Sequence, residues 1–202
     1  MLVDASIARS FAVVGWTRHL LELSGGTILV ADGVHGADPD DPSELRRIRR
    51  ALQRQADDSG LGSGRSSRAL SAVQGLDELL TFDFGKLTVL TLSGDEVELA
   101  VRLQSRRPED RAWRHSLGAK ARRLDAGEAA SIAIALTRSR AFASDDDDAL
   151  TLWEALSGAP GWRTRDLLRK LVTQGAVAEQ EARDVYHLLQ MDDLHNLAGP
   201  AW

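Results

Sequence analysis

Apolar residues recur along most of this chain with the two spacings that separate strands from helices. Short apolar runs typical of strands lie at residues 2–3, 27–31, 87–92 and 141–143. Between them, apolar residues three and four positions apart indicate helices. The expected helices cover residues 7–24, 43–58, 68–80, 93–103, 108–123, 125–137, 149–157, 164–173 and 179–190. Strands that alternate with helices favour the α/β class, with a mainly parallel sheet covered on both faces.

Glycine, proline and serine mark where these elements end. Gly25-Gly26 closes the first expected helix, and the Gly/Ser-rich segment 59–67 is the stretch we expect to be most flexible. We interpret residues 1–160 as one α/β domain with a helical insertion at 38–80. We interpret residues 161–202 as a C-terminal helical extension packed on the same domain.

Length and composition narrow the class of protein further. A chain of 202 residues that is 43% hydrophobic can bury one good core. It has no cysteine, which excludes disulfides and thiolate zinc sites. No segment approaches the roughly 20 apolar residues of a membrane helix, and the N-terminus lacks the pattern of a signal peptide. We therefore expect a cytoplasmic protein with no membrane partner.

The formal net charge of −5 argues against binding nucleic acid through bulk charge alone. Nearly all the positive charge is arginine, which clusters at 46–50, 106–123 and 163–169. These arginines either decorate solvated helix faces or form a basic rim around an acidic cleft. A basic rim would suit a substrate with phosphates, because arginine binds phosphate bidentately.

Acidic residues stand where the expected strands end and where the expected helices begin. Asp4 follows the first strand directly, and Asp145–Asp148 follow the strand at 141–143. Asp125 and Glu128 have the spacing of a capping box. Ligands gather at the carboxyl ends of strands in open α/β sheets, so these acids could converge on a hard divalent cation. Glu128 could instead serve only as a helix cap, and the aspartate run could be an acidic helix start.

Taken together, these motifs resemble the PIN-domain nucleases, in the subgroup that carries Gly-Glu-Ala. The first match is Val3-Asp4-Ala5-Ser6, an N-terminal strand that ends in Asp before a small residue and Ser or Thr. The second is Gly127-Glu128-Ala129 at the start of an apolar helix, and the third is the strand 141–143 that runs into acids. A helical tail from Arg163 onward is also similar. The resemblance extends over residues 1–31 and 124–190.

The resemblance implies a three-layer α/β/α fold with a parallel sheet of about five strands and a C-terminal helical pair. It also implies Mg²⁺- or Mn²⁺-dependent cleavage of RNA. The family's acidic cluster maps onto Asp4, Glu128 and Asp145 as metal ligands, with Asp146 or Asp147 able to replace Asp145 or to bind through water. A further catalytic acid in the N-terminal half matches Glu44, with Asp32 as its rival.

Family members often have Thr two residues before the last acid. Counted from Asp145, Ala143 stands at that position here, and Ser144 stands one residue before the acid. Many members of the subgroup are toxins of toxin–antitoxin pairs, and many are dimers. The resemblance therefore implies an antitoxin protein and a second copy of the chain as partners.

The leading hypothesis is a metal-dependent endoribonuclease of this family, in the setting of a toxin–antitoxin pair. The arginines of 46–50 and 163–169 would hold RNA, while the helices of 42–80 would hold RNA or clamp an antitoxin. One alternative is a catalytically impaired PIN-like protein that serves as a binding or regulatory partner. Another is a phosphohydrolase with Asp4 as nucleophile, which Ser6 disfavours because a second acid is expected there.

Overall fold

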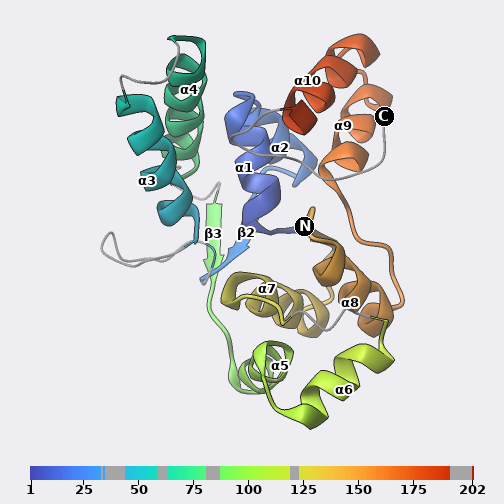
Figure 1. The fold of residues 1–202 in the computed structure, drawn as a ribbon. Coiled ribbons are helices and arrows are strands. Elements are labelled where there is room, and N and C mark those ends of the chain that lie inside the picture. The colour runs from blue at the N-terminus through green and yellow to red at the C-terminus, as the bar shows by residue number, and fades with distance from the viewer. Residues whose placement is uncertain (33, 35–43, 59–62, 81–86, 119–122, 192–201) are drawn as a thin grey trace.

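The computed structural model describes residues 1–32, 34, 44–58, 63–80, 87–118, 123–191 and 202. Within them the chain forms a four-stranded sheet and ten helices (Figure 1). The strands are β1 Leu2–Val3, β2 Ile28–Ala31, β3 Leu87–Leu90 and β4 Phe142–Ala143. The helices are α1 Ala5–Val13, α2 Thr17–Leu23, α3 Glu44–Asp57, α4 Ser63–Leu80, α5 Gly94–Gln104, α6 Pro108–Ser116, α7 Ala126–Thr137, α8 Asp147–Ser157, α9 Thr164–Thr173 and α10 Glu179–Met191.

All neighbouring strands of the sheet pair in parallel, in the order β3-β2-β1-β4. The α/β class and the parallel sheet are therefore confirmed. About five strands were expected, and the described residues form four. Beyond β4 there is an isolated parallel bridge, in which Trp162 N donates to Phe142 O (3.0 Å) and Ser144 N donates to Trp162 O (2.9 Å).

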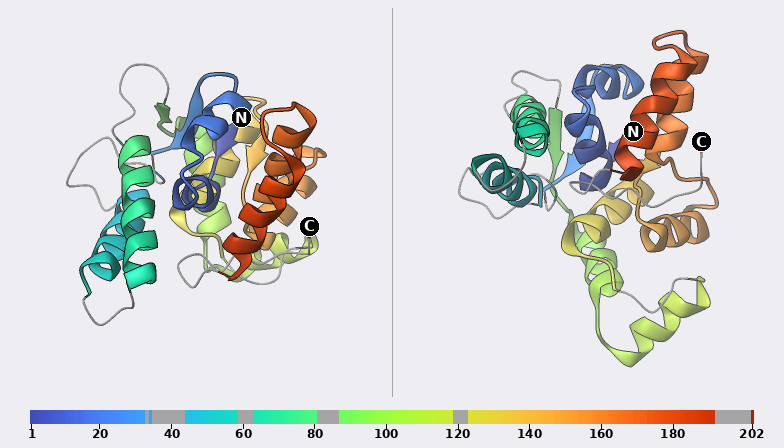
Figure 2. Two further views of the ribbon diagram at one scale, coloured as in Figure 1. Left: turned by 90° about the horizontal axis from the view of Figure 1, so that it is seen from above. Right: turned by 45° about the horizontal axis from the view of Figure 1, so that its top comes forward.

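Helices lie on both sides of the strands, an arrangement compatible with three layers. The helix α7 contacts β1, β2 and β4, whereas α1 lies across the strands from it with α3 and α4 beyond (Figure 1). The pair α9 and α10 lies beside α2 (Figure 2). Leu167, Leu168 and Leu171 of α9 belong to the same hydrophobic cluster as Leu2 and Val3 of β1. The domain boundary at residue 160 stays a prediction.

The expected single helix over residues 7–24 is wrong, because the chain forms α1 and α2 with a turn between them. Gly15 has a φ of +71°, which ends α1 in the left-handed conformation that glycine adopts readily. Trp16 N donates to Phe11 O (2.8 Å), the six-residue bond of a Schellman motif. The apolar spacing continues through this turn, so periodicity alone does not reveal it.

Two other expected helix ends also differ. The segment 59–67 was expected to be flexible, but α4 already begins at Ser63, while 59–62 lie outside the described residues. Once a packed helix has formed, each added residue gains one hydrogen bond, which offsets poor propensity. The arginine-rich helix expected over 108–123 ends at Ser116, followed by Gly118 with a φ of +90°. The expected cap at Asp41-Pro42 lies outside the described residues.

An ion pair fastens α5 to α7. Arg138, at the end of α7, donates to both carboxylate oxygens of Glu96 (2.8 and 2.9 Å) and to Thr91 O (2.7 Å). Glu96 is 1% exposed, and the Arg138 guanidinium beside it lowers its pKa to about 2. This pair fixes the outer helices α5 and α6 relative to α7. In the described part of the chain, no helix has the length and apolar character needed to cross a membrane.

Close packing of α1 against α4 depends on Gly75. A Cβ at this position would overlap the backbone carbonyl oxygen of Ala12. Overpacking costs about 1–3 kcal/mol, whereas alanine gains up to ~1 kcal/mol of helix propensity over glycine. We expect Gly75→Ala to lower the free energy of unfolding by about 1–2 kcal/mol, measured by urea denaturation.

The matched control is Gly94→Ala at the start of α5, where an added Cβ would meet nothing within 4 Å. We expect its free energy of unfolding to stay within about 0.5 kcal/mol of the wild type. Equal stability of the two variants would contradict the close packing of α1 against α4.

Candidate acidic site at the carboxyl end of the sheet

The centre of the candidate site is Asp4, which follows the central strand β1. Its backbone N–H continues the sheet by donating to Ala143 O (3.0 Å), and its side chain is 3% exposed. One carboxylate oxygen, Oδ2, accepts hydrogen bonds from Ser144 (3.0 Å) and Ser6 (3.1 Å). The other, Oδ1, is buried without a hydrogen-bond partner. Burial is the largest cause that raises the pKa of Asp4 to about 6.

Two serine hydroxyls connect Asp4 to the aspartates after β4. Ser144 Oγ accepts from Asp146 N (3.1 Å) while it donates to Asp4. Ser6 Oγ accepts from Asp145 N (3.0 Å). These bonds fix the backbone of the aspartate run relative to Asp4. In the sequence, Ser6 and Ser144 are recognisable only as motif residues, because spacing along the chain cannot reveal that both bond to Asp4.

Glu44 reaches the site from the first residue of α3. Leu45 N donates to Val34 O (3.0 Å), which places the start of α3 beside the end of β2. The Glu44 oxygen Oε2 is buried without a hydrogen-bond partner and would lie 2.7 Å from a Cβ at Gly127. Burial is the first cause that raises the pKa of Glu44 to about 8, followed by the negative charges of Asp4 and Asp125. The glycine of the Gly-Glu-Ala motif thus leaves room for the Glu44 carboxylate.

Glu128 enters the site from the first turn of α7. The expected capping box is confirmed, because Glu128 N donates to Asp125 Oδ1 (2.8 Å) and Asp125 N donates to Glu128 Oε2 (2.9 Å). Burial, followed by the negative charges of Asp125, Asp4 and Asp146, raises the pKa of Glu128 to about 8. Glu128 is therefore both a cap and a member of the acidic group. Asp125, expected only as a cap, is a second acid beside it.

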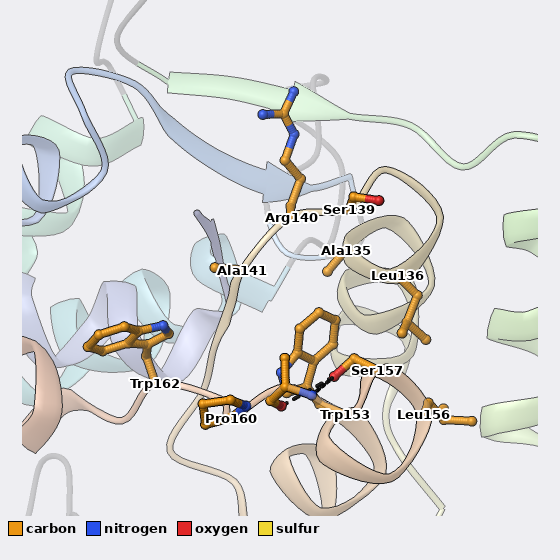
Figure 3. Close-up of a pocket in the computed structure, with 11 residues that line it drawn as sticks. Ala135, Leu136, Ser139, Arg140, Ala141, Trp153, Leu156, Ser157, Pro160 and Trp162 are labelled. Carbon is orange, nitrogen blue, oxygen red and sulfur yellow. Dashed lines mark hydrogen bonds between the residues drawn. The ribbon is translucent and has the colours of Figure 1, made fainter.

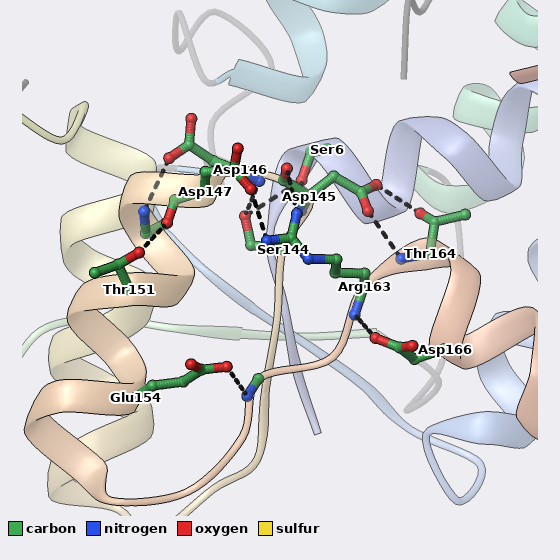
Figure 4. Close-up of polar contacts among 12 residues, drawn as sticks. Ser6, Ser144, Asp145, Asp146, Asp147, Thr151, Glu154, Arg163, Thr164 and Asp166 are labelled. Carbon is green, nitrogen blue, oxygen red and sulfur yellow. Dashed lines mark hydrogen bonds and ion pairs between the residues drawn. The ribbon is translucent and has the colours of Figure 1, made fainter. Parts of the chain in front are cut away.

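The aspartates 145 and 146 point in different directions (Figure 4). Asp145 Oδ1 accepts from Thr164 N (2.8 Å), and its Oδ2 accepts from Thr164 Oγ1 (2.6 Å) and Ser10 Oγ (3.3 Å). Asp146 caps α8 through Ala149 N (2.8 Å), and its charge acts on Glu128. Asp146 thus caps α8 and acts electrostatically on Glu128, whereas Asp145 holds the start of α9.

Asp147 and Asp32 stand apart from this group. Asp147 is exposed and pairs with Arg163 (2.6 Å), as Figure 4 shows. Asp32 lies just past β2, and its charge is not among the main causes that raise the pKa of Asp4 or Glu44. Of the two rival acids in the N-terminal half, Glu44 is the one that the structure places in the group.

We define the acidic site as Asp4, Glu44, Asp125, Glu128 and Asp146. Its members come from the ends of β1 and β4 and from the starts of α3 and α7. Within the described residues, no three acidic or histidine side chains lie close enough together to surround a metal ion as they stand. Two carboxylate oxygens of this group, Asp4 Oδ1 and Glu44 Oε2, are buried with no hydrogen-bond partner among the described residues and could contribute to a cation's shell.

A separate apolar cavity of about 590 Å³ lies at the opposite end of β4 (Figure 3). It is lined by the end of α7, by Ala141, and by Trp153 and Trp162. None of the expected acids lines it. The chemistry of the acidic site therefore belongs to the carboxyl end of the sheet, away from this cavity.

Comparison of the chain with protein-family models, with curated proteins and with solved structures found no match in any of the three.

The acidic site predicts a pH-dependent stability in metal-free buffer with EDTA. Since the pKa values of Glu44 and Glu128 are raised from 4.5 to about 8, the folded chain binds more protons than the unfolded chain between these values. The free energy of unfolding should therefore fall as pH rises from about 4.5 to 8. We expect Glu44→Gln to flatten this slope and to gain at least about 1 kcal/mol over wild type at pH 8, measured by urea denaturation.

The control for this experiment is Glu98→Gln, at an exposed position of α5. It removes the same charge outside the acidic site. Identical pH slopes for the two variants would show that Glu44 is not held in a repulsive, desolvated environment.

Proposed function

We propose that this chain is a divalent-metal-dependent ribonuclease of PIN type, which hydrolyses RNA phosphodiesters at the acidic site. One observation carries the proposal, namely that acids from four separate segments act on one another electrostatically. The charges of Asp4 and Asp125 raise the pKa of both Glu44 and Glu128, and Asp146 raises that of Glu128. Carboxylates are crowded at such cost to stability mainly where their charge is used.

The donor set suits Mg²⁺ or Mn²⁺, which prefer oxygen ligands and retain several waters. Asp4, Glu128 and Asp146 are the proposed ligands, and among the described residues Asp4 Oδ1 is a buried oxygen with no hydrogen-bond partner. These side chains are not preassembled around one point. Glu128 has three side-chain torsions with which to reach a shared ion.

A bound divalent ion would lower the pKa of a water and offset charge on the scissile phosphate. The residues of the chain have distinct parts in this proposal. Ser6 and Ser144 orient Asp4 through its Oδ2, which leaves Oδ1 directed elsewhere. Glu44 has a pKa of about 8 in the metal-free chain, so it would accept a proton from the attacking water near neutral pH only once a bound cation lowers that pKa.

Two further features support the PIN assignment in particular. If Asp146 is the last acid of the family pattern, Ser144 stands two residues before it and supplies the hydroxyl that members often have there. Because Gly127 has no Cβ, the Glu44 carboxylate can lie against it. This is a physical reason for glycine in the Gly-Glu-Ala motif. An antitoxin and a second copy of the chain remain proposed partners on the resemblance alone.

Of the two arginine clusters proposed for RNA, the one on α3 is the more available. Arg47, Arg50 and Arg54 line a shallow pocket there, whereas Arg49 pairs with Asp77 (2.5 Å). In the C-terminal cluster, Arg163 is held by Asp147. The α3 cluster is therefore our candidate for contact with the RNA backbone.

The alternative is a PIN-like protein that binds RNA or a partner without cutting. The observation that favours it is that the acids are not assembled around a single point. RNA binding with no cleavage in either Mg²⁺ or Mn²⁺ would support this alternative.

The first test is cleavage of a mixed RNA pool with Mg²⁺, with Mn²⁺ and with EDTA. Two variants remove charge while they preserve local structure, because Gln at 128 can complete the capping box and Asn at 146 can cap α8. We expect Glu128→Gln and Asp146→Asn each to lose at least about a hundredfold in rate, since each removes a charge that positions the ion.

The matched control is Asp147→Asn, adjacent in the chain but exposed and turned toward Arg163. We expect it to cleave at a rate within about threefold of wild type. Metal-independent cleavage, or equal loss in Asp147→Asn and Asp146→Asn, would contradict the proposed site.

Metal binding can be measured without catalysis. A ligand at about 100 times its dissociation constant stabilises a fold by about 2.7 kcal/mol, or about 5–10 °C in Tm for a chain of this size. We expect Mn²⁺ at pH 8 to raise the Tm of wild type by this amount and that of Asp4→Asn by less than about 2 °C. An equal rise in both proteins would place Mn²⁺ binding outside the acidic site.

A further inference from the structure

Four arginines converge on a pocket beside α6 that neither proposed RNA cluster includes. The pocket is lined by Ser105, Arg106, Arg111, Arg114 and Arg123 and by no acidic residue. It lies where the turn between α5 and α6 meets the segment that leads into α7. In Figure 1, α5 and α6 lie beyond α7, on its side away from the sheet.

Arg114 is the fixed part of this pocket. Its side chain is 2% exposed, and it donates to two backbone carbonyls, Arg102 O (2.9 Å) and Ser105 O (2.8 Å). Its Nε is buried and has no hydrogen-bond partner. The groups that hydrogen-bond to the guanidinium are therefore neutral.

The charges around Arg114 do not balance it. Asp110 is the acid that acts on it, but Asp110 does not line the pocket and bonds to Arg102 (3.3 Å). Burial lowers the pKa of Arg114, and the like charge of Arg111 lowers it further. Arg106, Arg111 and Arg123 are exposed, so three solvent-accessible guanidinium groups line the pocket beside one buried group. Convergent like charges of this kind are relieved by a bound anion, and arginine suits phosphate.

The pocket adjoins the acidic site along the chain. Arg123 stands two residues before Asp125, so their Cα atoms are at most about 7 Å apart. A polymer with regularly spaced phosphates could therefore occupy both sites at once.

We propose that this arginine pocket binds a backbone phosphate of single-stranded RNA and holds the strand beside the acidic site. This inference rests on the proposed ribonuclease function, because that function names the polymer. The pocket would add affinity without base specificity, since phosphate contacts carry no sequence information.

The test is RNA binding without cleavage, in EDTA, followed by fluorescence anisotropy of a short labelled oligouridylate. The variant is Arg106→Gln with Arg111→Gln, both exposed, so that the fold is retained and can be checked by its Tm. We expect affinity to fall about tenfold. The slope of log affinity against log salt should flatten by about 0.7, which corresponds to the loss of one single-strand phosphate contact.

The matched control is Arg18→Gln with Arg140→Gln, which removes the same net charge at two exposed positions on other elements. We expect its affinity to stay within about twofold of wild type. Equal losses in the two double variants would overturn the proposal, because bulk charge would then explain the binding.

A second arm uses inorganic phosphate alone, measured by titration calorimetry. If the arginine variant loses phosphate binding but keeps full RNA affinity, the pocket serves a free phosphate and the strand assignment is overturned. Cleavage with Mg²⁺ is scored separately. If wild type does not cleave RNA but the arginine variant still loses RNA affinity, the ribonuclease function is overturned and the proposal for the pocket is supported. If wild type cleaves RNA and the arginine variant keeps full RNA affinity, the ribonuclease function is supported and the arginine pocket is overturned.

Discussion

The burial of Asp4 at the carboxyl end of the central strand is the constraint on which the site depends. An acid that is 3% exposed must be satisfied by neighbours or must keep a proton. Here two serine hydroxyls satisfy one oxygen and leave the other without a partner. The same hydroxyls accept hydrogen bonds from the backbone N–H groups of Asp145 and Asp146. One hydrogen-bond network therefore both stabilises the Asp4 carboxylate and fixes the chain after β4.

Each of the other acids is positioned by backbone structure rather than by attraction to its neighbours. Glu128 is held by the α7 capping box, Asp146 by its cap on α8, and Glu44 by the bond between Leu45 and Val34. Since these bonds belong to secondary structure, the core of the fold keeps the like charges close. Burial, and after it this repulsion, raises the pKa values of Glu44 and Glu128. The ionised carboxylates therefore lower the free energy of unfolding near neutral pH, where the proposed function would use their negative charge.

The sequence predicted most of the elements and the positions of the acids, because both follow local rules. Capping-box spacing located the start of α7, and apolar runs located all four strands. What it could not predict depends on geometry between distant segments. The turn at Gly15 interrupts a helix whose apolar spacing is unbroken, and the choice between Glu44 and Asp32 depends on how α3 docks. Likewise, four consecutive aspartates carry no signal for which one acts on Glu128 and which one bonds to Thr164.

The two aspartates that follow Ser144 make different contacts: Asp145 bonds to Thr164, and Asp146 caps α8. Asp145 turns toward Thr164, where both its oxygens accept hydrogen bonds. Asp146 instead begins α8 as its cap, and its charge acts on Glu128. Asp145 also accepts from Ser10 of α1, so one carboxylate joins α1 to the start of α9. The C-terminal helices are thus tied to the same short segment that presents Asp146. A displacement of α9 would move the acidic site through that segment, which makes the helical extension a structural part of the site.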